Sequence, residues 1–117
     1  MNVTIYHNPR CSKSRQTFAL IEEQNINANV VEYLKTPPSV SELKKILKLL
    51  DLSPRELMRK NEAEYKSLNL ADESLSDEQL IQAMHENPKL IERPIVVIDD
   101  LRAAIGRPPE NILSLFQ

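Results

Sequence analysis

The stretch NVTIYHNPRCSKSRQTFALIEEQN (residues 2–25) changes its structural period within a few residues. Residues 2–7 are mostly β-branched or aromatic, which is typical of a β-strand. After a short polar turn, three residues recur at the spacing of one helix face: Ser14, Phe18 and Ile21. The sequence therefore predicts a strand at 2–7 followed directly by a helix at 11–25.

A second strand is predicted at residues 28–34, which read ANVVEYL and are followed by the prolines of KTPPS. Two parallel strands need a crossover connection, usually a helix, and that crossover is right-handed in nearly all proteins. The first third of the chain is therefore predicted to form a β-α-β unit, the building block of an α/β sheet.

The middle of the chain carries one helix-start signal three times. In each copy a serine is followed three residues later by Glu or Gln, and the two side chains satisfy backbone N–H groups that the first helical turn leaves open. The three pairs are Ser39–Glu42, Ser53–Glu56 and Ser76–Gln79. We therefore expect a mostly helical insertion over about residues 39–87.

The last part of the chain is predicted to return to the sheet. RPIVVID (93–99) is typical of a buried strand, and LRAAIG (101–106) can pair with it as a hairpin across Asp99-Asp100. RPPENILSLF (107–116) is predicted to close the chain as a helix. It has proline in its first turn, a position where helices tolerate proline. The expected order is β-α-β, helical insertion, β-β-α, in one α/β domain over residues 1–117.

Composition and charge argue against several kinds of partner. The formal net charge is −2 with a pI near 5.7, so no overall attraction to nucleic acid or to an anionic membrane is expected. No apolar run approaches the length of a membrane span, and no basic leader precedes an apolar segment. One cysteine and two histidines offer neither an internal disulfide nor a good zinc site. We expect a soluble, cytoplasmic protein with no metal and no tightly bound cofactor.

Cys11, the only cysteine, allows two interpretations. At a helix start it lies beside open backbone N–H groups and the positive end of the helix dipole, and Arg10, Lys13 and Arg15 add positive charge. Such surroundings lower a thiol pKa from about 8.5 to roughly 3.5–7.5 and favour a reactive thiolate. The alternative is an inert buried thiol, because free cysteine is among the most buried residue types. The polar flanks on both sides suit a loop better than a core.

Two common thiol chemistries do not match the spacing around this cysteine. A phosphatase cradle requires arginine six residues after the cysteine, where this chain has Thr17. A dithiol redox motif requires a second cysteine at the position of Ser14. His85 lies near a predicted helix end, where a cation complements the dipole, so we expect a structural or surface role for it.

Three arginines distant in the sequence are candidates for holding an anion. Arg59 follows a short helix, and Arg93 and Arg107 precede prolines in extended or turn segments, where functional groups often lie. The planar fork of a guanidinium matches tetrahedral oxyanions. Each arginine alone is more typical of a solvated surface than of an anion site, and the sequence does not show whether the three side chains converge.

Four motifs, in this order, resemble those of the glutaredoxin-coupled arsenate reductase (ArsC) family. They are IYHNPRCSKSR (5–15), ELMRKNE (56–62), ERPIVV (92–97) and GRPPE (106–110). The chain is similar to the short, ArsC-like branch of that family over essentially its whole length. The resemblance implies a thioredoxin-like fold with an inserted helical subdomain.

The resemblance also implies a role for the residues of each motif. Cys11 matches the nucleophile, and Arg59, Arg93 and Arg107 match a clamp for the oxyanion. The segment before GRPP varies in length among relatives, so Arg102 competes with Arg107 for the third place. The Arg-Pro context favours Arg107.

His7 and Ser14 match positions whose side chains support the thiolate in that family. Thioredoxin-like folds place a cis-proline opposite the active-site cysteine, at the start of the third strand. The resemblance therefore implies that the Arg93–Pro94 peptide bond is cis, although only about 5–6% of such bonds are cis in folded proteins.

The activity implied is the reduction of arsenate to arsenite, a step in arsenic detoxification. Glutathione is the implied co-substrate and glutaredoxin the implied protein partner. The single cysteine agrees with an external reductant, because it cannot resolve an adduct by forming a disulfide within the chain.

Two other functions remain open at this point. The same fold is similar to that of Spx-type regulators, which bind RNA polymerase, although Ser14 removes the Cys-x-x-Cys switch that they usually carry. A thiol oxidoreductase acting on another oxyanion is the third interpretation, because a guanidinium clamp recognises tetrahedral anions in general.

Overall fold

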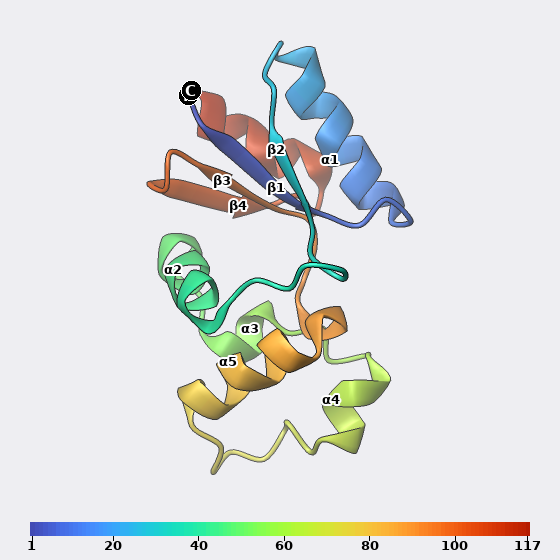
Figure 1. Ribbon diagram of the computed structural model, residues 1–117, viewed down its shortest axis with the longest axis vertical. Helices are drawn as coiled ribbons and strands as arrows, with labels where there is room; N and C mark the ends of the chain where they lie inside the picture. Colours follow the sequence, from blue (N-terminus) through green and yellow to red (C-terminus); the bar gives the residue numbers. More distant parts are fainter. The chain divides into compact units, whose positions relative to one another are not determined.

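The computed structural model describes residues 1–117, and its helices and strands are drawn in Figure 1. In chain order the elements are β1 (Val3–His7), α1 (Ser12–Glu23), β2 (Asn29–Glu32), α2 (Val40–Leu50), α3 (Pro54–Leu57), α4 (Ala63–Ser67), α5 (Asp77–Glu86), the 3-10 segment η1 (Pro88–Leu90), β3 (Ile95–Ile98), β4 (Arg102–Ile105) and the 3-10 segment η2 (Pro109–Phe116).

The chain divides into two compact units. Met1–Thr36 and Arg93–Gln117 together form the sheet unit, which contains every strand. Pro37–Glu92 forms the helical unit, and the predicted insertion at 39–87 lies within it.

The sheet unit is built on four strands in the order β2-β1-β3-β4. β1 pairs in parallel with β2, as the predicted β-α-β unit requires, and antiparallel with β3. β3 and β4 form the predicted hairpin, in which Asp99 and Asp100 adopt the left-handed backbone conformation that a tight turn needs. The predicted strands are therefore confirmed, although β2 is shorter than its sequence pattern.

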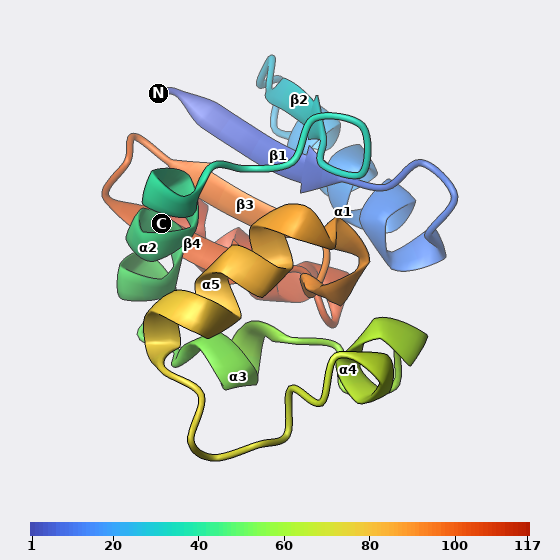
Figure 2. The same ribbon diagram turned by 60° about the horizontal axis from the view of Figure 1, so that its bottom comes forward.

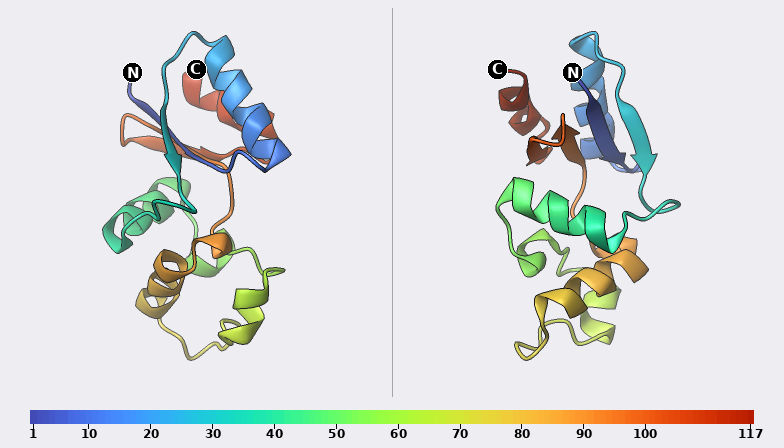
Figure 3. Two further views of the ribbon diagram at one scale, coloured as in Figure 1. Left: turned by 45° about the vertical axis from the view of Figure 1, so that its right-hand side comes forward. Right: turned by 60° about the vertical axis from the view of Figure 1, so that its left-hand side comes forward.

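One face of the sheet is covered by α1 and η2, which pack against each other (Figure 3). Apolar residues from the two segments and from the sheet form one buried cluster: Val3, Ile5, Ile21, Val96, Ile98, Ile112 and Leu115. Helix α1 begins after Cys11 and ends before Asn25, whose φ of 58° lies in the left-handed region typical of a helix end.

The helical unit is arranged around α5, which packs against α2, α3 and η1 (Figure 2). All three predicted capping boxes are present, at the starts of α2, α3 and α5. A β-bridge between Met58 and Ile91 joins the two ends of the unit, with the N–H of Glu92 donating to the carbonyl oxygen of Leu57 at 2.9 Å. Residues 57–59 therefore lie alongside residues 90–92.

The C-terminal helix differs from its prediction. The sequence indicates an ordinary helix over 107–116, whereas the structure forms a 3-10 segment that begins only at Pro109. Pro109 is the first residue of the segment, and the N–H of Asn111 donates to the carbonyl oxygen of Pro108 with the three-residue spacing of a 3-10 turn.

No helix of this chain combines the length and the apolar character that a bilayer crossing requires. His, Cys, Asp and Glu side chains nowhere gather in groups of three or more that could hold a metal ion.

Candidate active site

Cys11 is the N-cap residue of α1 and connects that helix to the loop that follows β1. Its N–H donates to the carbonyl oxygen of Asn8 at 3.0 Å, and its own carbonyl accepts the N–H of Arg15 at 3.0 Å. The Arg15 side chain returns to the same loop, because its Nη1 donates to the carbonyl of Pro9 at 2.9 Å. The thiol is partly exposed, so the interpretation of Cys11 as a buried core residue is wrong.

The pKa of the Cys11 thiol is lowered, as a net result of opposing effects. Partial burial, the largest single effect, raises the pKa. Hydrogen bonds from the backbone N–H groups of Ser14 and Lys13, together with a hydrogen bond from the Arg93 side chain and its positive charge, outweigh burial. The start of α1 and one arginine thus stabilise the thiolate, as expected at a helix N-terminus.

Arg107 lies against the sulfur. Its Nη2 donates to Cys11 Sγ at 3.6 Å, across 96 positions of sequence. Its Nε donates to the carbonyl oxygen of Arg93 at 2.7 Å, which fixes the plane of the guanidinium and joins the two arginine segments. Arg93 and Arg107 therefore both lie beside Cys11, and the backbone carbonyl of Arg93 orients the guanidinium of Arg107.

Pro94 connects these arginines to the sheet. The Arg93–Pro94 bond is cis, as predicted, and the Arg107–Pro108 bond, for which no prediction was made, is also cis. The carbonyl oxygen of Pro94 accepts the N–H of Gly106 at 2.9 Å, so the start of β3 and the end of β4 are held together.

His7 and Ser14 form a buried pair behind the loop. Ser14 is fully buried, and its Oγ accepts the N–H of Asn8 at 3.0 Å. His7 Nδ1 is hydrogen-bonded to the same Oγ at 2.6 Å. The pKa of His7 is lowered by burial and, to a smaller extent, by the charge of Arg15, while Glu32 opposes the shift. The pair ties the end of β1 to the first turn of α1 and so supports the loop that carries Cys11.

Arg59 lies in the helical unit, where its guanidinium is paired with two carboxylates. Its Nε is 3.2 Å from Glu62 Oε1 and its Nη1 is 2.9 Å from Glu92 Oε1. Burial lowers the pKa of Arg59, but the hydrogen bonds and charges of the two glutamates raise it overall. The role of Arg59 in an oxyanion clamp stays a prediction.

Arg102 is exposed on β4, and its Nη1 donates to the carbonyl oxygen of Gln117 at 3.4 Å. Of the two competing arginines, the one in contact with Cys11 is Arg107. His85 Nδ1 is hydrogen-bonded to the carbonyl oxygen of Pro38 at 2.8 Å, which agrees with a structural role for this histidine.

Sequence reasoning expected Arg15 only as a nearby positive charge and gave Gly106 no role, so two contacts at the site were not predicted. The Arg15 side chain closes the loop before Cys11 through the carbonyl of Pro9. Gly106, the only glycine, lies so close to Thr17 and Pro94 that a Cβ atom would contact both. The occurrence of glycine once, directly before Arg107, was the signal that could have indicated a close approach.

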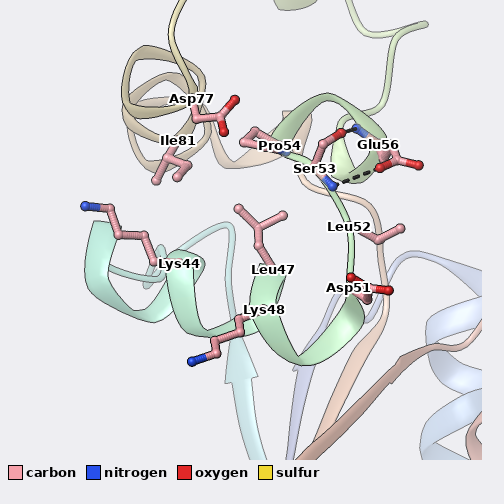
Figure 4. A pocket seen from close by; sticks show the side chains of 10 residues that line it. All are labelled: Lys44, Leu47, Lys48, Asp51, Leu52, Ser53, Pro54, Glu56, Asp77 and Ile81. Atoms are coloured by element: carbon pink, nitrogen blue, oxygen red, sulfur yellow. Dashed lines mark hydrogen bonds between the residues drawn. The ribbon is translucent and has the colours of Figure 1, made fainter.

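Each unit contains a hollow at its surface. The first, called here the β2-side pocket, has a volume of about 270 Å³ and lies in the sheet unit at the ends of β1 and β2. A larger and more open hollow of about 500 Å³ lies in the helical unit, where Leu47 and Ile81 point toward each other between α2 and α5 (Figure 4). None of the predicted site residues lines the larger hollow.

Comparison with known proteins agrees with this arrangement. The family model described as ArsC family matches residues 6–115. The chain belongs to the ArsC family. The resemblance drawn from its four motifs is therefore confirmed.

Relatives of this ArsC-family chain match it over nearly all of its length. The Escherichia coli K12 protein YfgD, named as uncharacterized, is 58% identical over 114 residues, covering 97% of this chain and 95% of the relative. An arsenate reductase of Neisseria meningitidis serogroup A is 50% identical over 115 residues, covering 97% of each chain. The solved structure of an arsenate reductase from Vibrio cholerae has a TM-score of 0.93 and 56% identity, covering 97% of each chain. The predicted α/β, thioredoxin-like fold class is confirmed with the family.

Proposed function

We propose that this ArsC-family protein is an arsenate reductase in which the Cys11 thiolate is the nucleophile. The observation that carries the proposal is the contact of the Arg107 guanidinium with Cys11 Sγ, 3.6 Å apart, at the start of α1. A nucleophilic sulfur beside an anion-binding fork is what attack on a tetrahedral oxyanion requires. Relatives at 50% and 56% identity that bear the name arsenate reductase support the same activity.

In the proposed first step, the Cys11 thiolate attacks the arsenic atom of arsenate. A sulfur–arsenic bond forms, an arsenic–oxygen bond breaks, and the oxygen leaves as hydroxide. Arg93 and Arg107 neutralise the oxyanion and hold its arsenic in reach of the sulfur. Arg59 is proposed, from the resemblance alone, as the third member of the clamp.

The electrons come from thiols. Arsenic acid and two thiols give arsenious acid, one disulfide and one water, so arsenic gains two electrons and two sulfur atoms are oxidised. This chain supplies at most one of those thiols, because Cys11 is its only cysteine. We propose glutathione as co-substrate and glutaredoxin as the protein that regenerates Cys11, which would place the reaction in the cytoplasm, where glutathione is kept reduced.

A coupled assay tests this function. Wild-type protein with arsenate, glutathione, glutaredoxin, glutathione reductase and NADPH is expected to oxidise NADPH, and Cys11→Ser is expected to lose turnover entirely. Arg93→Ala and Arg107→Ala each remove a preorganised donor and are expected to lower kcat/KM for arsenate about 10²- to 10³-fold. Arg102→Ala, an exposed arginine on the same unit, is the matched control and should leave turnover unchanged.

Full activity of Cys11→Ser would overturn the proposed mechanism. A wild-type protein that shows no arsenate turnover, but reduces another tetrahedral oxyanion in the same assay, would retain the site and change the substrate, because two guanidiniums recognise the shape and charge that such anions share.

A further inference from the structure

The proposed reaction needs a second sulfur close to Cys11, and the inference that follows rests on that proposed function. Only one of the two thiols oxidised per arsenate comes from this chain. A small thiol that is bound beside Cys11 would react faster than a thiol in free solution, because binding makes the reaction effectively unimolecular. A binding place for the co-substrate is therefore expected within reach of the loop that carries the cysteine.

The β2-side pocket lies next to that loop. Its wall on one side is formed by consecutive loop residues, Asn8, Pro9 and Arg10, which lead directly into Cys11. The carbonyl of Asn8 accepts the Cys11 N–H at 3.0 Å, so the residues of this pocket wall and Cys11 belong to the same hydrogen-bonded turn. The volume of about 270 Å³ is close to the lower end of the range for small-molecule sites, about 300–1,000 Å³.

The order of the strands places this pocket away from the arginines. Cys11 follows β1, and the sheet runs β2-β1-β3-β4. Arg93 comes just before β3 and Arg107 just after β4, so both reach Cys11 from the β3 side of β1. The pocket lies on the β2 side, where Glu32 is the register partner of His7. An oxyanion held by the arginines would leave this side open to a second reactant.

The charges around the pocket suit a zwitterion. Arg10 and Lys35 are exposed cations at its rim, and Glu32 supplies one anion. Lys35 Nζ lies 3.7 Å from Glu32 Oε1, and the Lys35 side chain is 80% exposed and that of Glu32 44%, so this pair is weak and can exchange partners with a ligand. Leu34 adds apolar surface and is 40% exposed.

We propose that the β2-side pocket binds the small thiol co-substrate, a peptide-like molecule that carries free carboxylates, an ammonium group and a short apolar stem, beside Cys11. Its carboxylates pair with Arg10 and Lys35, its ammonium group pairs with Glu32, and its stem lies on Leu34 and Pro9. The thiol then reaches Cys11 from the side opposite Arg93 and Arg107.

A binding experiment tests the location without any turnover. ¹⁵N-labelled Cys11→Ser protein is titrated with reduced glutathione, with excess sulfate present to occupy the arginines, and amide chemical shifts are followed. The expected result is saturable shifts at Asn8, Arg10, Leu34 and Lys35. S-methylglutathione should give the same shifts, because the charges and not the thiol carry the binding, whereas 2-mercaptoethanol should give none.

A kinetic experiment tests the charges. Lys35→Glu is expected to raise the KM for glutathione about fivefold, the size of one exposed charge interaction, while kcat at saturating glutathione and the KM for arsenate stay unchanged. Leu34→Asp should raise the same KM by removing the apolar contact and adding repulsion. Lys89→Glu makes the same change of charge at an exposed lysine of η1 and should leave every constant as in wild type.

Different results separate the pocket from the proposed function. Glutathione-dependent shifts only around Arg93 and Arg107, or an unchanged glutathione KM in both Lys35→Glu and Leu34→Asp, would overturn the pocket assignment while arsenate turnover persists. Absence of arsenate turnover by wild type would overturn the proposed function, and the titration would still decide whether a zwitterionic thiol binds in this pocket.

Discussion

At the scale of single residues, the thiolate of Cys11 depends on a balance between burial and donors. Burial opposes the negative charge, whereas backbone N–H groups of α1 and the Arg93 side chain stabilise it. Arg107 completes the surroundings of the sulfur, with its own orientation set by the carbonyl of Arg93. The donors that activate the thiol are therefore also those that would bind the oxyanion.

The lowered pKa of Cys11 predicts how its alkylation varies with pH. Since only the thiolate reacts, the rate with iodoacetamide should reach half of its maximum at a lower pH than for a free cysteine. Arg93→Gln removes one hydrogen bond and one positive charge, so its midpoint should move to higher pH. Arg102→Gln is the control and should titrate as wild type. A midpoint for Arg93→Gln at or below that of wild type would contradict the assignment.

Ser14 and Ser12 form a matched pair for testing the buried serine. Ser14→Ala leaves the N–H of Asn8 and the Nδ1 of His7 without their buried partner, which should lower the free energy of unfolding by about 1–3 kcal/mol. Ser12→Ala, at an exposed position two residues earlier in α1, should change the free energy of unfolding by less than about 0.5 kcal/mol. Urea unfolding of both variants measures the difference, and equal values would show that the buried pair adds no stability.

At the scale of elements, the site depends on the close approach of α1 to the end of β4. Thr17 of α1 is fully buried, and its hydroxyl bonds to the carbonyl of Lys13 and lies 3.4 Å from that of Gly106. Gly106 leads directly into Arg107. The distance between α1 and β4 therefore helps to decide where the Arg107 guanidinium lies relative to the cysteine at the start of α1.

Gly106→Ala tests that approach. A Cβ atom would lie 2.9 Å from Pro94 Cγ and would also press on Thr17, so the free energy of unfolding should fall by about 1–3 kcal/mol. Thr17→Ala makes room, and the double variant should therefore lose less than the sum of the two single variants. Thermal or urea unfolding of the four proteins in this cycle measures the coupling, and strict additivity would argue against the contact.

Taken as a whole, the protein has a small net charge, and the burial of residues differs from strand to strand in its sheet. The net charge is only −2, so attraction of an anionic substrate depends on a few local cations and not on the overall field. Every residue of β3 is buried and β1 is nearly as well covered, whereas β2 and β4 form the edges of the sheet with exposed or half-buried residues.

This distribution predicts the order of hydrogen exchange in the sheet unit. Amides of β1 and β3 should exchange slowest, near the rate set by global unfolding, because both strands are paired on two sides. Amides of β2 and β4 should exchange faster through local opening of the edges. Exchange followed by NMR under native conditions gives the rates residue by residue. Equal protection of β2 and β1 would contradict this picture of the sheet.

The sequence alone determined features that depend on neighbouring residues. Three features arise from contacts between residues a few positions apart, so they are visible as local patterns. They are the change from a strand to a helical period around Cys11, the three serine capping boxes, and the hairpin turn at Asp99 and Asp100. The four motifs resemble those of a known family, and that resemblance added the proposal that arginines distant in the sequence bind an oxyanion beside one cysteine.

Which side chains contact each other at the site follows from how the strands pair, and local sequence patterns do not show it. Whether Arg102 or Arg107 contacts Cys11 depends on strand pairing that brings together residues 96 positions apart, and no local pattern records that register. The close approach of Gly106 to Thr17 and the pocket between β1 and β2 have the same origin. Helices and turns are stabilised by near neighbours, whereas a site is a convergence of segments, and its geometry exists only once the sheet has set their positions.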